Sequence, residues 1–319
     1  MKLVFCGTPR FAVPTLEALM TAGHDIALVV SQPDRPVGRV QELSAPPVKQ
    51  TALAAGIPVT QPEKIRNNEE FRSQLEAIGP DAIIVVAYGR IIPQWMLELP
   101  RLGCINLHAS LLPKYRGAAP IQWAVAMGES FTGNTTMRID EGLDTGPILM
   151  QRAMGIDPEE SAIDLFDELA IGGAPLVVET LAGLEDGSIE LRPQEDEHAT
   201  VAPLLTREDG RMDFVARTAV ELKNRWRGFQ PWPGAFTSIE GKKLIVHRMS
   251  VPVSTEAAPI DLPPGGEPGA IVVNGDRMII GCAQDTWIEL IEVQLEGKKR
   301  MPVCDFLRGY THITGMRLG

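Results

Sequence analysis

Two polar side chains interrupt an otherwise apolar stretch, Gly-Cys-Ile-Asn-Leu-His-Ala-Ser, at 103–110. Alternate residues of a strand share a face, so Asn106 and His108 are predicted to point the same way, with Ser110 next on that side. A neutral imidazole accepts a proton near neutral pH, and a side-chain amide can donate to a developing oxyanion. The same pattern fits a structural histidine beside its asparagine neighbour, because buried polar groups are normally hydrogen-bonded. Spacing alone leaves both interpretations open.

A second polar cluster lies at 138–149, where Asp140, Glu141 and Asp144 stand among glycines that permit a tight loop. An EF-hand is excluded because the twelve-residue ligand spacing and its closing glutamate are missing. Taken alone, the cluster is more simply interpreted as an acidic turn. Beside an imidazole, however, a carboxylate would orient the ring and stabilise its cation. An amide, an imidazole and a carboxylate without a nucleophilic serine or cysteine suit direct acyl transfer to an amine.

Cys104 is the alternative nucleophile, but it lies two residues before Asn106, deeper in the apolar strand, where a thiol is more typical of packing. The four cysteines are scattered, without a CxxC pair or a Cys/His ladder. This spacing disfavours structural zinc and a disulfide framework, so we expect no metal and a reducing, cytoplasmic location. The sequence has no GxGxxG after its first apolar strand and no Walker A run, which disfavours dinucleotide and ATP sites.

The elements that must position these residues alternate between apolar strands and helical patterns. The run at 82–87 is continuously apolar, as expected of a strand buried on both faces. One helix is predicted to begin at an asparagine cap and to end at Gly79. A longer helix is predicted to begin at Ser161, which forms a capping-box pattern with Asp164. The alternation predicts an α/β fold with a doubly wound, mostly parallel, Rossmann-like sheet. Further strands are predicted at 3–6, 26–31 and 103–110.

The character of the chain changes after about residue 185. Residues 190–206 are acidic and polar without a helical period, and we interpret them as a linker. Residues 207–319 carry one predicted helix, at 214–228, and then short alternating segments between turn signals. Regularly spaced short strands predict a small, OB-like β-barrel. We therefore expect a catalytic domain at 1–189, the linker, and a β-barrel domain at 207–319.

Charge and composition narrow the function classes. The net charge of −11 opposes nucleic-acid binding, yet residues 207–319 hold 15 basic and 14 acidic side chains, so that part could carry a basic face. Aromatic residues make up 5% of the chain, which disfavours an RNA binder that stacks bases on an aromatic sheet. Apolar runs fall far short of the ~18 residues of a membrane helix, and the one at the N-terminus is too brief for a signal peptide. We expect no membrane association.

Over essentially its whole length, the sequence resembles the family of methionyl-tRNA formyltransferases. The run HASLLPKYRGAAPI, with GLDTG after it, is typical of the wider group of folate-dependent formyltransferases. The runs QPDRP, LLTREDGRMDF and PWPGAF narrow the resemblance to enzymes that act on tRNA. It implies that the formyl group of 10-formyltetrahydrofolate is transferred to the α-amine of initiator methionyl-tRNA for translation initiation.

The resemblance also assigns roles to the polar clusters. It implies that Asn106, His108 and Asp144 form the catalytic trio, in which Asn106 and His108 stabilise the oxyanion. His108, oriented by Asp144, would help to move a proton from the attacking amine toward the leaving folate nitrogen. The implied folate-contacting residues are Ser110, Leu111, Leu112 and Pro113, and those implied to wall the pterin pocket are Tyr88, Gly89, Arg90, Ile91, Ile92, Gly142 and Leu143.

For tRNA, the family places a loop after the second strand against the acceptor end. Arg35 and Arg39 match its arginines, but residues 40–42 read Val-Gln-Glu where relatives often carry Gly and Lys, which removes positive charge. Gln230 stands where Asn is common. Charged hairpin ends are usually just solvated, so a tRNA role and a solvated role both stay open for the C-terminal basic residues. The candidates are Lys242, Lys243, Arg248, Lys298, Lys299 and Arg300.

Two alternatives remain on sequence grounds. A formyltransferase of a small amine, or a formyl-folate hydrolase, would use the same trio but would not need a C-terminal β-module of ~110 residues. An RNA-binding protein with a vestigial catalytic fold would not need the trio intact. The sequence demands nothing beyond a monomer, which is the expected state.

Overall fold

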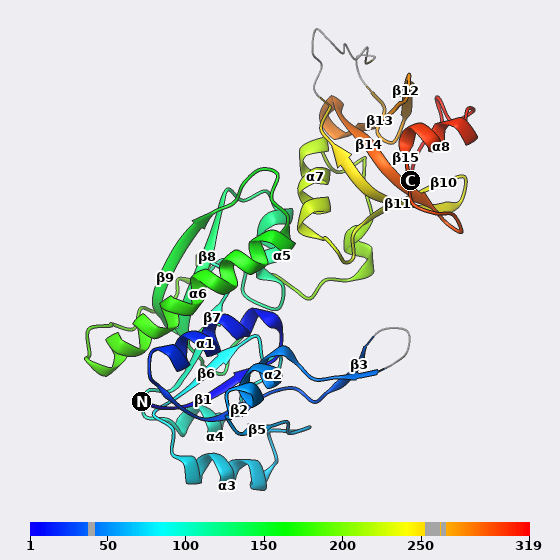
Figure 1. The fold of residues 1–319 in the computed structure, drawn as a ribbon. Helices are drawn as coiled ribbons and strands as arrows, with labels where there is room; N and C mark the ends of the chain where they lie inside the picture. Colours follow the sequence, from blue (N-terminus) through cyan, green and yellow to red (C-terminus); the bar gives the residue numbers. More distant parts are fainter. Residues whose placement is uncertain (38–41, 253–261, 263–265) are drawn as a thin grey trace. The chain divides into compact units, whose positions relative to one another are not determined.

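The computed structural model describes residues 1–37, 42–252, 262 and 266–319. They form two compact units, each of which is described by itself (Figure 1). Unit 1 comprises Met1–Ile121, Phe131–Ile156 and Asp164–Pro203. Unit 2 comprises Gln122–Ser130, Asp157–Ile163 and Leu204–Gly319. Within the described part of the chain, no helix is both long and apolar enough to cross a membrane.

Unit 1 is built on a seven-stranded sheet with the order β5-β2-β1-β6-β7-β8-β9 (Figure 1). The first five strands in this order run parallel, and the last two are antiparallel to their neighbours. The predicted mostly parallel α/β sheet is thereby confirmed. The strands are β1 (Lys2–Gly7), β2 (Asp25–Val30), β5 (Val59–Thr60), β6 (Ala82–Val86), β7 (Cys104–His108), β8 (Phe131–Arg138) and β9 (Ile148–Gly155), and a separate hairpin pairs β3 (Arg35–Val37) with β4 (Glu42–Ser44).

Local sequence explains how the helices of this unit begin and end. In α3 (Glu69–Ile78), the side chain of Asn68 accepts a hydrogen bond from the Phe71 N–H and caps the first turn. The helix ends at Gly79, whose φ of +57° is left-handed and suits glycine. Both predicted helix signals are confirmed. The other helices are α1 (Val13–Thr21), α2 (Pro47–Ala54), α4 (Gln94–Glu98) and α6 (Ala162–Glu185), with single turns η1 (Arg10–Ala12) and η2 (Asp196–His198).

Helices cover both faces of the sheet. Apolar side chains of α3 and α4 join those of β1, β2 and β6 in one core cluster, which also contains Cys104 of β7. On the opposite face, α6 lies close to β7, because a Cβ on Gly173 would come within 2.7 Å of the Leu107 side chain. Thr180 of α6 is hydrogen-bonded to Thr136 of β8 at 2.7 Å. Successive residues of β7 therefore alternate between the α6 face and the α4 face.

The hairpin formed by β8 and β9 was not predicted from the sequence. Strand β8 reads Phe-Thr-Gly-Asn-Thr-Thr-Met-Arg, and its polar middle is buried. Asn134, for example, donates to the Leu169 carbonyl of α6 at 2.9 Å. Buried polar residues in the middle of the strand hide the apolar alternation by which a strand is normally found. The loop between these strands, residues 139–147, carries the acidic cluster.

The segment predicted as a linker packs along unit 1 as far as residue 203. Ile148 at the start of β9 and Arg192 exchange backbone hydrogen bonds of 2.8 and 2.9 Å. Val201 forms a parallel bridge with Arg116, in the loop after β7. The segment has little regular structure, as its composition predicts, but hydrogen bonds set its course.

Unit 2 contains an antiparallel sheet with the path β10-β11-β14-β13-β12, and β15 pairs with β14. The predicted C-terminal β domain of short strands is thus confirmed, and its strands form an antiparallel sheet. Over the described residues the path is open, because no ladder joins β10 to β12. Alternate side chains of these strands form an apolar core. The strands are β10 (Ala235–Ile239), β11 (Lys242–Ser250), β12 (Ile271–Asn274), β13 (Arg277–Cys282), β14 (Thr286–Leu295) and β15 (Met301–Pro302).

The helix predicted at 214–228 begins later than expected, so that boundary was wrong. It is α7 (Ala219–Gly228), and Thr218 caps it in a capping box with Glu221. The residues before it form a turn because the Asp213 carboxylate accepts hydrogen bonds from the two backbone N–H groups that close it. The remaining elements of the chain are α5 (Pro120–Ala126), α8 (Val303–Gly309) and the single turns η3 (Arg207–Gly210) and η4 (Ala283–Asp285).

Candidate active site

One face of β7 changes from apolar to polar along the strand. Cys104 lies in the core, with its Sγ 3.3 Å from the Met96 carbonyl, and burial raises the pKa of the thiol to about 12. Strand alternation places Asn106 and His108 on the same face. Asn106 is partly exposed, and its side chain forms no hydrogen bond within the described residues. The amide is therefore available to a ligand.

The imidazole of His108 is held by a backbone carbonyl. Its Nε2 lies 2.9 Å from the Tyr115 oxygen, and the side chain is 6% exposed. A carbonyl oxygen can only accept, so Nε2 carries the hydrogen, and in the neutral ring Nδ1 keeps a free lone pair. Nδ1 lies 3.7 Å from Oδ2 of Asp144. The ring can therefore take a proton at Nδ1, beside a carboxylate that would stabilise the cation.

Asp144 reaches His108 from a loop that starts at the other end of β7. Ile139, which opens the loop, donates its N–H to the Cys104 carbonyl at 2.8 Å. Farther along, Oδ2 of Asp144 accepts a hydrogen bond of 2.8 Å from the Gly117 N–H. Asp144 has a φ of +52°, a left-handed conformation that costs a non-glycine residue free energy. Two segments remote in sequence thus meet at His108.

The other acidic residues of the loop have a different place. Oδ1 of Asp140 accepts hydrogen bonds from the Gly142 N–H at 3.0 Å and from Oγ1 of Thr145 at 2.7 Å, which closes the turn. A Cβ on Gly142 would lie 1.8 Å from Oγ1 of Thr145, so this turn requires glycine. Glu141 is exposed. Of the three carboxylates in the loop, Asp144 is the one that faces the imidazole.

Hydrogen bonds from β8 and β9 hold the backbone of the predicted folate-contacting run, Ser110 to Pro113. Oγ1 of Thr135 donates to the Ser110 carbonyl at 2.6 Å and accepts from the Leu112 N–H at 3.1 Å. Nε2 of Gln151 donates to the Leu112 carbonyl at 2.8 Å. These bonds set the backbone course of the run directly after His108. Ser110 and Leu112 are buried, whereas Leu111 and Pro113 are partly exposed.

The segment predicted to wall the pterin pocket follows β6. The side chain of Tyr88 lies in the core, where burial raises the pKa of its phenol, while its carbonyl accepts hydrogen bonds from Thr8 and Gln32. Nε of Arg90 is buried without a partner among the described residues, and Ile91 beside it is 79% exposed. An unsatisfied buried donor next to an exposed apolar side chain is a pattern that ligand binding would complete. Gly89, Gly142 and Leu143 are exposed, and Ile92 is buried.

Basic residues gather at one end of the sheet in unit 2. The Glu296 N–H donates to the Lys243 carbonyl at 2.8 Å, so the start of β11 lies beside the turn that follows β14. Burial, and next the charge of Arg207, lowers the pKa of Lys243, while the carboxylates of Glu208 and Glu296 oppose this shift. We call this group the basic cluster. Its members are Arg207, Lys242, Lys243, Lys298 and Lys299.

The other basic residues predicted to bind tRNA are not counted in the basic cluster. Arg300 forms an ion pair with Glu292. Arg248 stands opposite Glu292 in the pairing of β11 with β14. Arg35 is exposed at the start of β3, whereas Arg39 lies outside the described residues.

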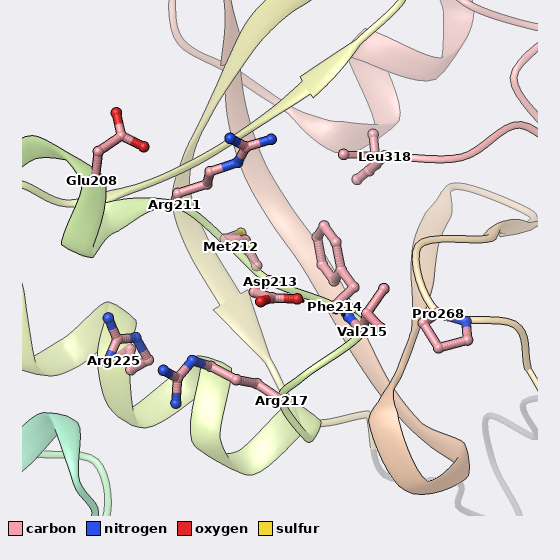
Figure 2. Close-up of a pocket in the computed structure, with 11 residues that line it drawn as sticks. Glu208, Arg211, Met212, Asp213, Phe214, Val215, Arg217, Arg225, Pro268 and Leu318 are labelled. Atoms are coloured by element: carbon pink, nitrogen blue, oxygen red, sulfur yellow. Dashed lines mark hydrogen bonds between the residues drawn. The ribbon is translucent and has the colours of Figure 1, made fainter.

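A cavity of about 500 Å³ in unit 2 is lined by three arginines that the sequence analysis did not select (Figure 2). Figure 2 shows Arg217 and Arg225 side by side, with Arg211 entering from another segment. Burial, and next the like charge of Arg217, lowers the pKa of Arg225. Arg225 has Asp209 as a counter-charge 3.9 Å away. Arg211 and Arg217 lie in the irregular stretch before α7, and Arg225 lies in α7, so their sequence spacing carries no signal.

Comparisons with known proteins bear on both units. The family model described as formyl transferase matches residues 1–181, and the model described as formyl transferase, C-terminal domain, matches residues 204–311. A protein of Acidobacterium capsulatum named methionyl-tRNA formyltransferase is 66% identical over 319 residues, covering 100% of both chains. One of Koribacter versatilis with the same name is 58% identical, covering 100% of this chain and 99% of that protein.

Solved structures show the same fold at low identity. The N-formyltransferase of Helicobacter canadensis, solved with folinic acid and dTDP-3-aminofucose, has a TM-score of 0.64 and 20% identity, covering 91% of this chain and 98% of that one. HypX from Aquifex aeolicus, solved with tetrahydrofolic acid, has a TM-score of 0.59 and 17% identity. It aligns with 98% of this chain and 48% of its own.

Proposed function

The chain belongs to the methionyl-tRNA formyltransferase family and formylates methionyl-tRNA for translation initiation, and on this premise we propose that Asn106, His108 and Asp144 carry the transfer. The formyl donor of the family is a formyl-tetrahydrofolate, here proposed to be the 10-formyl form. The acceptor is proposed to be the α-amine of the initiator methionyl-tRNA. The observation that carries the proposal is the free lone pair of His108 Nδ1, which faces Asp144 at 3.7 Å.

The residues around the site fit a folate that brings a formyl group. The Nε of Arg90, which has no partner among the residues that the structure describes, and the exposed Ile91 offer one donor and one apolar contact after β6. The pinned run from Ser110 to Pro113 offers a second wall directly after His108. When bound, the folate supplies an electrophilic formyl carbon. The chain holds it with these two segments and with the exposed Gly142 and Leu143.

The trio divides the chemistry among three groups. The free amide of Asn106 donates a hydrogen bond to the oxygen on which negative charge develops, in the manner of an oxyanion hole. Nδ1 of His108 accepts the proton of the attacking amine and returns it to the leaving nitrogen. Asp144 stabilises the imidazolium during the interval. The orienting hydrogen bond of the ring comes from the Tyr115 carbonyl rather than from Asp144, which differs from the role that the resemblance implied.

We place tRNA contacts on the basic cluster of unit 2. Lys242, Lys298 and Lys299 are exposed and Lys243 is partly exposed, and all four gather at one end of the sheet, where phosphates could contact them. The cavity of Figure 2 adds Arg211 and Arg217 in the same unit, although the acidic residues Glu208 and Asp213 also line it. Arg300 contributes less because Glu292 balances its charge. Arg35 and Arg39 remain proposed contacts of the loop after β2.

The two alternatives from the sequence predict different products. A small-amine transferase would formylate free amines, and a hydrolase would release formate without an acceptor. Purified protein should therefore be mixed with 10-formyltetrahydrofolate and either methionyl-tRNA or free amines, with folate turnover followed spectroscopically. We expect formylation of the tRNA alone. Rapid folate hydrolysis in the absence of an acceptor would overturn the proposal.

A further inference from the structure

One side chain of the segment that was predicted as a linker connects the two loops that hold the catalytic groups. Gln194 lies in a run of exposed residues but is itself half-buried. Its Oε1 accepts hydrogen bonds from Nε and Nη2 of Arg116 at 3.0 and 2.9 Å. Its Nε2 donates to the carbonyl oxygens of Asp144 at 2.8 Å and Gly146 at 2.7 Å. The amide thus uses both acceptor lone pairs and both donor hydrogens.

The two loops joined by this amide define the proton-transfer group. The first loop contains Tyr115, whose carbonyl sets the His108 tautomer, and Gly117, whose N–H binds the Asp144 carboxylate. The second loop contains Asp144 in its left-handed conformation. Because Gln194 binds the backbone of the second loop and the Arg116 side chain of the first, it fixes the separation of the loops. That separation includes the gap between Asp144 and Nδ1 of His108.

Further bonds hold the segment in place on the C-terminal side of Gln194. The Tyr115 N–H donates to Oγ1 of Thr200 at 2.8 Å, and the Arg116 N–H donates to the Thr200 carbonyl at 2.8 Å. Nη2 of Arg116 also pairs with Asp196 at 2.8 Å, although Arg116 is only 8% exposed. A buried guanidinium with satisfied partners is a rigid anchor, since leaving it unpaired would be costly. Gln194 therefore bonds to groups that are themselves fixed.

We propose that Gln194 is a positioning residue for formyl transfer, which acts through the Asp144 loop and does not touch the substrates. The inference rests on the proposed roles of His108 and Asp144. Proton transfer in a site of this kind depends steeply on geometry, and a displacement of ~1 Å can cost about a hundredfold in rate. The amide nitrogen of Gln194 holds the backbone of the Asp144 loop, and the amide oxygen holds the Arg116 side chain.

Two substitutions of Gln194 distinguish its donor function from its acceptor function. Gln194→Met keeps the length of the side chain and removes every hydrogen bond. Gln194→Glu keeps an acceptor for Arg116 but places a carboxylate against the carbonyl oxygens of Asp144 and Gly146, to which it cannot donate. Both variants should lower kcat by about tenfold to a hundredfold, with the KM for formyl-folate within about threefold of the parent. The matched control is Glu197→Gln, on an exposed neighbour in the same segment, which should keep parental kcat.

A double-mutant cycle distinguishes positioning from a general loss of structure. In an Asp144→Asn background, adding Gln194→Met should change kcat by less than about twofold, because both act on the same group. Additive losses would overturn the proposal, as would parental kcat in Gln194→Met. If His108→Ala is inactive and Gln194→Met is fully active, the role of Gln194 is rejected and the proposed function is kept. An active His108→Ala would instead reject the proposed function, and thermal unfolding of each variant checks that it is folded.

Discussion

Nε2 of His108 donates its hydrogen to the Tyr115 carbonyl at 2.9 Å. This bond leaves Nδ1 as the proton acceptor of the neutral ring and turns it toward Asp144. The tautomer is thus set by backbone, which cannot change its protonation state, and the carboxylate is left free to stabilise the cation. The arrangement explains why an aspartate at 3.7 Å is sufficient without a direct hydrogen bond to the ring.

Removal of the imidazole should abolish most of the turnover. His108→Ala is expected to lower kcat by at least ~10², the usual scale for loss of a general acid–base group. The control is His198→Ala, because His198 is exposed and pairs with Glu195 rather than with the site. Single-turnover formylation of methionyl-tRNA measures the effect. Near-parental turnover in the His108 variant would refute its role.

Asp144→Asn should keep the loop and lose the charge. The amide oxygen can still accept from the Gly117 N–H, so the fold is retained while the imidazolium loses its partner. We expect kcat to fall by about tenfold to a hundredfold, consistent with ~1–3 kcal/mol for a charged partner. Asp140→Asn is the matched control, since its Oδ1 only accepts within the turn. Equal losses in the two variants would show that charge at 144 is not the cause.

Asn106→Ala should lower activity without lowering stability. The side chain has no hydrogen-bond partner within the described residues, so its removal breaks nothing in the free protein. An oxyanion donor is typically worth ~10²–10³ in kcat. The melting temperature, measured by calorimetry, should stay within about 2 °C of the parent. A marked loss of stability with little change in kcat would indicate a structural role instead.

The basic cluster should account for part of the salt dependence of tRNA binding. Replacing Lys298 and Lys299 by Ala is expected to raise the KM for tRNA, and to reduce the slope of log K against log salt by about one for each phosphate that the variant no longer neutralises. The KM for folate should not change. Arg300→Ala is the comparison and should change the slope less, because the Arg300 side chain is already held in an ion pair with Glu292. An unchanged salt slope in the double variant would remove these lysines from the interface.

The buried cysteines should be unreactive in the folded protein. Burial raises the pKa of Cys104 and of Cys282 to about 12, and raises that of Cys6 well above its ordinary value. A raised pKa keeps the thiol protonated as pH rises, so at pH 8 only about one Cys104 in ten thousand would be thiolate. Iodoacetamide at pH 8 should therefore label Cys304, which is partly exposed, before the others. Rapid labelling of Cys104 with loss of activity would reopen its role as a nucleophile.

Local features of this protein were predictable because their physical causes are local. Strand alternation put Asn106 and His108 on one face, and an asparagine and Gly79 set the ends of α3 through the backbone groups that a helix leaves free. The start of α7 was misplaced because two local signals were overlooked. Thr218 and Glu221 form a capping box at the true start of the helix, and Asp213 closes a turn before it. Such signals lie within a few residues of the element that they define.

The sequence by itself thus determined the family, the alternation of parallel strands and helices in the first part of the chain, and the residue types of the site, but not the β8–β9 hairpin. The resemblance had already named Asp144, whereas the spacing of the acidic residues alone did not separate it from Asp140. Only the tertiary structure decided that Tyr115 sets the tautomer of His108 and that Gln194 of the supposed linker ties the two loops together. These contacts join segments that are distant along the chain. Periodicity and capping describe neighbours in sequence, whereas hydrogen bonds between loops depend on the full packing of the sheet, which no local pattern contains.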